Sequence, residues 1–138
     1  MLLGLLAALP ARADDLLFQE ARIALPPPGA GQAAGYLEVV SRAARPCRLT
    51  GAASDVAERV EFHRHLHHNG MMAMRPVAAV ALPAGGRLSF APGGLHLMLI
   101  GLRRPLAAGE SVQIRLETDV CGSHLLSATV VDLRETSP

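Results

Sequence analysis

Two histidines and two methionines have a spacing that could bring them to one metal ion. They are His63, Met74, His96 and Met98, in the pattern H-x10-M-x21-H-x-M. The methionine thioether is a soft, uncharged sulfur ligand, and the histidine imidazole is borderline in softness. Thioethers select Cu(I) among biological metals, whereas zinc and iron sites are usually built from thiolate, imidazole or carboxylate. If the four side chains converge, the sequence predicts a Cu(I) site.

Three more histidines, His65, His67 and His68, follow closely after the first one. Imidazole also binds Zn and Cu(II), and histidine-rich tracts often form loose sites for these metals. We therefore interpret these three as a secondary metal patch, with a solvated strand end as the alternative. His96 differs from them because it lies in an apolar run, where a neutral imidazole needs a hydrogen-bond partner or a metal.

The segments that must position these residues have the pattern of β-strands. Residues 60–67 alternate between one set that includes Val60 and Phe62 and a second set that includes the histidines at 63, 65 and 67. Asn69-Gly70 follows, and it predicts a two-residue hairpin turn because both positions tolerate positive φ. Residues 71–77 would then form the returning strand. This hairpin brings His63 and Met74 onto adjacent strands, but the sequence leaves open which histidine faces Met74.

Residues 95–102 predict another strongly apolar strand. His96 and Met98 are two residues apart and therefore share one face, while Leu95, Leu97 and Leu99 take the opposite face and belong to the core. The remaining predicted strands, separated by turns rich in proline and glycine, cover residues 16–23, 34–41, 47–52, 87–90, 112–118 and 125–133. Short strands at this spacing indicate an all-β sandwich or barrel.

The composition of the chain argues against several classes of function. The chain has 138 residues, enough for one domain with its own core, and neither a repeat nor a linker divides it. Its net charge is +1, from 13 arginines and no lysine against 12 acidic residues. This balance argues against nucleic-acid or polybasic membrane binding, which need clustered positive charge. We expect no enzymatic activity, because no nucleophile, base and orienting group occur at a suggestive spacing and no glycine-rich phosphate loop is present.

The first thirteen residues resemble a shortened export signal. An apolar run over residues 2–9 precedes Ala11-Arg12-Ala13, which fits an A-x-A cleavage motif. We therefore expect residues 1–13 to be a signal peptide and residues 14–138 to be a single mature β-domain, with a frayed apolar N-terminus as the alternative. The run is shorter than the roughly 20 apolar residues that a membrane span needs. We expect the mature chain to be soluble and without a span.

Cys47 and Cys121 are the two cysteines of the chain. An even count permits a disulfide in an oxidising compartment, and two buried free thiols are the alternative. Cys121-Gly122-Ser123-His124 also begins like the loop of a blue-copper electron carrier, whose site needs a cysteine, two histidines and a weak axial methionine. No methionine follows this loop in the chain, which argues against an electron carrier.

The pattern as a whole resembles the PCuAC family of periplasmic copper chaperones, whose hallmark is the same H-x10-M-x21-H-x-M motif. The resemblance covers about residues 15–133 and includes the sequence around each ligand, at 60–63, 69–77 and 92–99. It implies a cupredoxin-like Greek-key β-barrel that binds one Cu(I) near its surface through His63, Met74, His96 and Met98. It also implies a periplasmic protein that supplies copper toward the CuA centre of cytochrome c oxidase, with subunit II or a Sco-type copper protein as partner.

The chain departs from this family pattern at its additional histidines. His65 stands where many members have methionine, and His67, His68 and His124 add further imidazoles. Sites rich in imidazole also hold Cu(II) and Zn, so we expect the additional histidines to bind Cu(II) as well as Cu(I). The alternative function is a periplasmic histidine-rich β-domain that buffers Cu(II) or Zn without delivering it to a specific partner.

Overall fold

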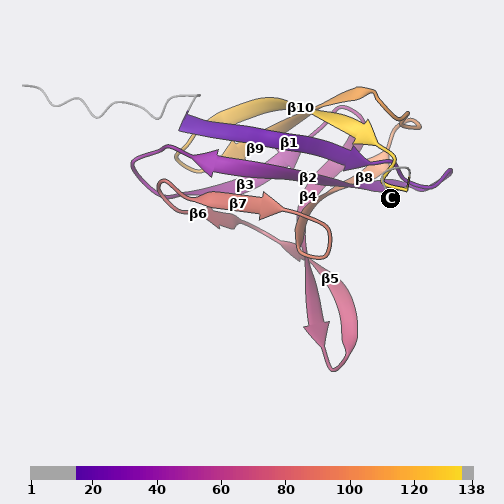
Figure 1. Ribbon diagram of the computed structural model, residues 1–138, viewed down its shortest axis with the longest axis horizontal. Helices are drawn as coiled ribbons and strands as arrows, with labels where there is room; N and C mark the ends of the chain where they lie inside the picture. The colour runs from indigo at the N-terminus through magenta and orange to yellow at the C-terminus, as the bar shows by residue number, and fades with distance from the viewer. Residues whose placement is uncertain (1–14, 135–138) are drawn as a thin grey trace, which may run out of the picture.

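The computed structural model describes residues 15–134, and the predicted signal peptide at residues 1–13 lies outside this range. Within it the chain forms ten β-strands (Figure 1), which confirms the predicted all-β class. Their bounds are β1 (Leu16–Ala24), β2 (Gln32–Ser41), β3 (Cys47–Ala53), β4 (Ala57–His68), β5 (Met71–Val77), β6 (Val80–Leu82), β7 (Arg87–Phe90), β8 (Leu95–Leu102), β9 (Ser111–Thr118) and β10 (Ser123–Val131). No helix within the described range has the length and apolarity needed to cross a membrane.

Seven of the strands close into a barrel. The hydrogen-bonded order is β4-β8-β2-β1-β10-β9-β3, and the pairing of β3 with β4 completes the ring. Strand β5 extends the sheet from β4, while β6 pairs with β3 and β7 with β2. Neighbours that are not consecutive in the chain, such as β8 and β2, require the crossover connections of a Greek-key barrel. The barrel expected from the family resemblance is therefore confirmed.

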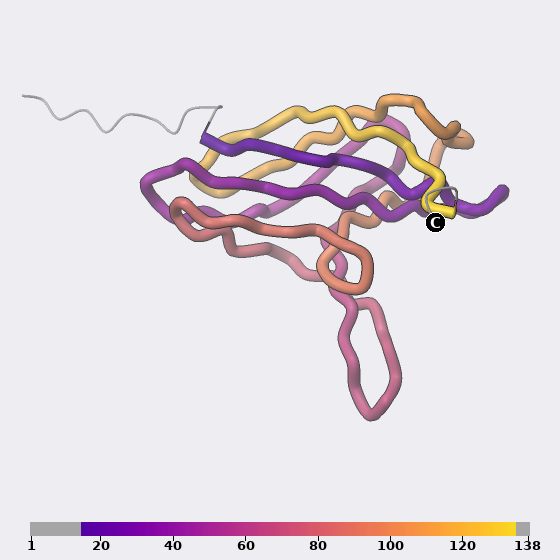
Figure 2. Tube along the Cα trace, viewed as in Figure 1, coloured from indigo at the N-terminus to yellow at the C-terminus, as the bar shows by residue number. Residues whose placement is uncertain are grey.

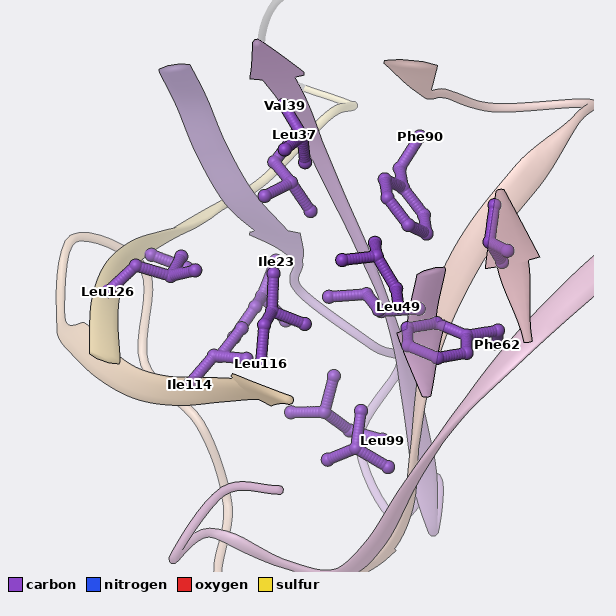
Figure 3. Close-up of a cluster of buried hydrophobic side chains, with 14 of the residues drawn as sticks. Ile23, Leu37, Val39, Leu49, Phe62, Phe90, Leu99, Ile114, Leu116 and Leu126 are labelled. Atoms are coloured by element: carbon purple, nitrogen blue, oxygen red, sulfur yellow. The ribbon is translucent and has the colours of Figure 1, made fainter. Parts of the chain in front are cut away.

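Aliphatic side chains fill the barrel, as the low aromatic content requires. Alternate residues of the barrel strands point inward; on β9 these are Val112, Ile114 and Leu116, all fully buried. Figure 3 shows such residues from several strands converging on one cluster that includes Phe62 and Phe90. The rings of these two phenylalanines lie 6.0 Å apart, centroid to centroid. Burial of this apolar surface is the main stabilising contribution to the fold.

Strand β8 contributes to the core with one face and carries two candidate ligands on the other. Leu95, Leu97 and Leu99 are buried in the interior, as the sequence predicts. His96 and Met98 therefore lie on the outer face of the barrel. They are nevertheless only 2% and 6% exposed, since β8 lies between β4 and β2 and side chains from both neighbours cover it. The outer face at β8 is thus a sheltered position for polar groups.

The β4–β5 hairpin extends beyond the barrel (Figures 1 and 2). Its turn residues Asn69 and Gly70 have φ values of 51° and 75°, the positive values that the Asn-Gly pair predicts. Strand β5 has the predicted bounds. Along the inward face of β4 the last core residue is Phe62, and Leu66 farther out is exposed. The distal half of the hairpin therefore lies outside the hydrophobic core.

A disulfide joins Cys47 at the start of β3 to Cys121 in the turn before β10, with the two Cα atoms 6.0 Å apart. Both cysteines are buried. The ring of His124 is placed by this turn, because its Nε2 donates to the carbonyl oxygen of Cys121 at 2.7 Å and its ring packs edge-on against Phe18. Strand β10, which carries His124, pairs with β1 and β9. His124 is therefore a structural residue, apart from the other histidines.

Candidate metal site

The pairing of β4 with β8 sets the centre of the site. His63 lies directly opposite His96 in this antiparallel pair, and their ring centroids are 5.9 Å apart. Glu61 lies opposite Met98. Because residues two apart on a strand share a face, His63, His96 and Met98 all lie on the outer face of the barrel. Three of the four predicted ligands are thus neighbours on two adjacent strands.

Met74 approaches from the other side of β4. It lies opposite His65, whereas His63 faces Pro76. The ring of His65 in turn lies 5.1 Å from the ring of His96, centroid to centroid. Met74 is 44% exposed, in contrast to the buried Met98. The outer face therefore carries Met74, His65 and His96 side by side across β5, β4 and β8, with His63 next to them.

His96 is held through its Nδ1 atom. This nitrogen lies 3.1 Å from the carbonyl oxygen of Gly94, and because a carbonyl only accepts, Nδ1 must carry the proton. In the neutral ring Nε2 then holds the lone pair that can bind a metal. Burial lowers the pKa of His96, the hydrogen bond to Gly94 opposes this effect, and the neighbouring His65 and His63 add to the lowering. The site therefore favours the neutral ring that a ligand requires.

His63 is held through the other ring nitrogen. Its Nε2 lies 2.8 Å from Oε2 of Glu61, so Nε2 donates to the carboxylate. The same hydrogen bond is the main cause of the lowered pKa of Glu61. Nδ1 of His63 is left with the lone pair of the neutral ring, and it is buried without a hydrogen-bond partner. Buried polar atoms are rarely left unpaired, and this one fits a metal ligand.

His65 presents a second buried nitrogen of the same kind, since its Nδ1 also has no hydrogen-bond partner. Its backbone N–H donates to the carbonyl oxygen of Gly94 at 3.4 Å, the same oxygen that accepts from His96. The turn that carries this carbonyl contains Gly93 with a φ of 81°, a conformation that glycine adopts readily. One turn thus fixes the positions of both His65 and His96.

Tyr36 on β2 covers the side of His96 that faces away from β4. Its ring lies 6.5 Å from the ring of His96, and the guanidinium of Arg22 on β1 lies over it, 5.4 Å from the ring centroid. Burial raises the pKa of the Tyr36 hydroxyl, and the charge of Arg22 partly opposes the shift.

Sequence reasoning missed both Tyr36 and Glu61. The signals available were that Tyr36 is the single tyrosine and that Glu61 lies two residues before His63.

The remaining histidines of the run are divided between the two faces of the hairpin. His67 follows His65 on the same face and lies opposite Met72, while His68 points to the other face and lies opposite Met71. Both histidines are exposed. Across residues 15–134, no three His, Cys, Asp or Glu side chains are grouped in a way that would hold a metal ion.

The donor set consists of neutral groups. Two imidazoles carry free lone pairs, at Nδ1 of His63 and Nε2 of His96, and the thioethers of Met98 and Met74 lie on the same outer face. A soft thioether set completed by imidazole suits Cu(I) better than Zn or Fe. The residues present therefore fit a monovalent copper ion.

In sequence, the chain is similar to proteins that are described as putative lipoproteins. The family model described as "Putative lipoprotein LpqE-like" matches residues 16–130. "Putative lipoprotein Lxx21020" of Leifsonia xyli subsp. xyli (strain CTCB07) is 34% identical over 89 residues, which is 64% of this chain and 54% of that protein. The chain thus matches about half the length of that curated relative.

Two solved structures share the fold over most of the chain. The copper-bound PCuAC domain from PmoF2 aligns with a TM-score of 0.72 and 26% identity, over 86% of this chain and 93% of that domain. The solution structure of Cu(I)-bound DR1885 from Deinococcus radiodurans aligns with a TM-score of 0.69 and 32% identity, over 85% of this chain and 78% of that protein.

Proposed function

Because the chain belongs to the LpqE-like family and folds as a PCuAC domain, we propose that it is a copper chaperone. It binds one Cu(I) through His63, Met74, His96 and Met98 and passes the ion to another protein. The observation that carries this proposal is the pair His63 and His96, which face each other with one ring nitrogen anchored and the other left for a metal. Two similar structures were solved with copper bound.

The ligand chemistry suits a carrier outside the cytoplasm. Thioether and imidazole do not form disulfides, so they keep a working site where a thiolate pair would be oxidised. Both cysteines of this chain are already committed to a disulfide, which is itself typical of an exported protein. Neutral ligands leave the bound ion with its positive charge, so binding is moderate and the ion can be handed on by ligand exchange.

We assign the domain to the periplasm and its copper to the CuA centre of cytochrome c oxidase. Subunit II of the oxidase or a Sco-type copper protein is the receiving partner. The family resemblance supports this assignment, and the relationship to lipoproteins supports export. The role is binding and transfer of an ion, with no catalytic step.

A Cu(I) titration against a chromophoric competitor, under anaerobic reducing conditions, tests the proposal. The parent protein should bind one equivalent, and Met98→Leu should bind it much more weakly. Met71→Leu is the matched control, because it makes the same replacement at a position that is 73% exposed and lies on the opposite face of the hairpin from Met74. Parent-like binding in both Met98→Leu and His96→Ala would refute the assignment.

A second candidate function is the buffering of Cu(II) or Zn by the histidines. The observation in its favour is that His65 lies nearer to His96 than His63 does, at 5.1 Å against 5.9 Å between ring centroids, and has a free buried nitrogen. Titration with Cu(II) and Zn separates the two functions. A buffer would bind Cu(II) and Zn as tightly as Cu(I), and its metal affinities would be unchanged in Met98→Leu. The chaperone would bind Cu(I) more tightly than Cu(II) or Zn and would lose Cu(I) affinity in Met98→Leu.

A further inference from the structure

Beyond the four proposed ligands, the hairpin carries another histidine–methionine pair on the same face. Moving outward from the barrel, the directly opposed pairs on this face are His63–Pro76, His65–Met74 and His67–Met72. The last two each combine one imidazole with one thioether. They form a ladder that starts beside His96 and ends near the exposed turn of the hairpin.

We propose that His67 and Met72 form an outer Cu(I)-exchange site, and that His65 connects it to the inner site. Copper then enters and leaves along this one face of the hairpin. The inference rests on the proposed function, because it assigns the route by which the same ion reaches and leaves its ligands. It adds three residues, His65, His67 and Met72, to the path of the metal.

The spacing of the ladder allows such a route. Directly opposed residues of an antiparallel pair have Cβ atoms about 4.5–5.5 Å apart, so an imidazole and a thioether of one pair can reach the same ion. Successive pairs on one face are about 7 Å apart along the strand. The flexible, unbranched methionine side chain lets its sulfur move over part of that distance. Neighbouring pairs can therefore share an ion during transfer.

Exposure increases along the same path. Met98 of the inner site is 6% exposed, Met74 is 44% exposed and Met72 is 61% exposed. The donors thus lead from a sheltered position to one that a partner protein can reach. The inner site alone offers a partner only the half-exposed Met74, since His96 and Met98 are covered by their neighbours. An outer site at the end of the hairpin gives a partner protein access to the copper.

The opposite face of the hairpin has no comparable path. Its opposed pairs are Arg64–Arg75, Leu66–Ala73 and His68–Met71. The pair His68–Met71 has the same two residue types as His67–Met72, but two cationic and two apolar side chains separate it from the barrel. Residues 62–77, the part of the hairpin in which β4 pairs with β5, include no Asp or Glu, so no carboxylate within this part offers a hard ligand. The pair His68–Met71 therefore serves as an internal control for the pair His67–Met72.

The transfer step is ligand exchange at constant oxidation state. With His67 in its neutral form, a new bond from copper to the Met72 sulfur or the His67 nitrogen forms as a bond to Met74 or His65 breaks. No electron is transferred, and no proton is released. The ion remains Cu(I) throughout, and each ligand returns to its uncharged free state.

Transfer kinetics test the inference. The double variant His67→Asn/Met72→Leu is compared with the matched variant His68→Asn/Met71→Leu and with the parent, each loaded with one Cu(I) and mixed rapidly with excess bathocuproine disulfonate. We expect an unchanged equilibrium affinity in all three and a release rate that falls about tenfold, equivalent to about 1.4 kcal/mol in the barrier, in the first variant only. Equal rates in the two variants would overturn the proposed route. A parent that binds no Cu(I) would instead refute the function on which it rests.

Methionine methyl spectra provide an independent test with Ag(I), a probe that mimics Cu(I) and is not oxidised in air. Up to one equivalent, the methyl signals of Met74 and Met98 should shift. Beyond one equivalent, the signal of Met72 should shift while that of Met71 remains in place, and the Met72 shift should be lost in His67→Asn. Parallel shifts of Met71 and Met72 would show unselective binding at the hairpin end and would overturn the proposal.

Discussion

His63 and His96 face each other across β4 and β8, and each is anchored through a different ring nitrogen. His63 donates from Nε2 to Glu61, and His96 donates from Nδ1 to the carbonyl oxygen of Gly94. The lone pairs that remain, at Nδ1 of His63 and Nε2 of His96, belong to rings whose orientation is already fixed. Hydrogen bonds of this kind set the tautomer and the direction of metal-binding histidines. The two imidazoles are therefore arranged before the metal arrives.

Glu61 should tune copper affinity without contacting the ion. Replacing Glu61 by Ala removes the acceptor that orients His63, and losses of such partners typically lower metal affinity by about 10–100-fold. We expect a loss of this size in a competitive Cu(I) titration. Glu61→Gln keeps an acceptor oxygen and should lose less. Glu38→Ala is the control, since Glu38 lies on β2 and bonds to Ser89. An Ala variant that binds as tightly as the parent would show that Glu61 does not orient the ring.

Met98 should be replaceable by leucine without loss of the fold. Leucine and methionine have similar volumes, and such exchanges usually change stability by less than about 1.5 kcal/mol. Met98→Ala leaves a cavity and should lower the free energy of unfolding by about 2–5 kcal/mol. Urea denaturation of both variants measures this difference. If Met98→Leu unfolds as readily as Met98→Ala, its loss of copper cannot be attributed to the missing sulfur.

His65 should affect Cu(II) binding more than Cu(I) binding. Its free Nδ1 adds an imidazole beside His96, and imidazole suits Cu(II) while thioether selects Cu(I). We expect His65→Asn to weaken Cu(II) binding and to leave Cu(I) binding nearly unchanged, as measured by parallel titrations. His68→Asn, on the other face of the hairpin, should change neither. Equal losses for both oxidation states in His65→Asn would contradict the assignment.

The disulfide should stabilise the fold and leave the metal site intact. Cys47 and Cys121 are 74 residues apart in the chain, and closing a loop of this size restricts the unfolded chain by about 4 kcal/mol. The double variant Cys47→Ala/Cys121→Ala should lose about that much free energy of unfolding in a denaturant titration. The folded variant should still bind one Cu(I), because β3 and the turn before β10 carry none of the proposed ligands. Loss of copper from the folded variant would link the disulfide to the site.

Much of the scaffold could be predicted because local chemistry determines it. The Asn69-Gly70 turn requires two positive φ values, and this fixed both the hairpin and the start of β5. Alternation of leucines with His96 and Met98 assigned the two faces of β8 correctly. Strand β6 was missed because its three residues are too few to show a period. Strand β10 begins and ends two residues before the predicted range.

The arrangement of the site could not be predicted because it depends on pairing between strands. A pattern with a period of two is unchanged when two strands slide by two residues, so the sequence could not decide which histidine faces Met74. The structure places His65 there and pairs His63 with His96, a residue 33 positions away in the sequence. The roles of Glu61 and Gly94 follow from the same register. They become visible only when the strands are aligned.

The coordination of copper in the loaded protein is the most direct test of the account. X-ray absorption at the copper edge should be recorded on the 1:1 Cu(I) complex of the parent, and on the variant Met74→Leu/Met98→Leu at a Cu(I) concentration high enough to load its weakened site. The parent should show a shell with both sulfur and nitrogen ligands, matching Met74, Met98, His63 and His96. The variant should lose its sulfur contribution. A parent shell that contains only nitrogen or oxygen, or a sulfur contribution that survives in the variant, would contradict the proposed site.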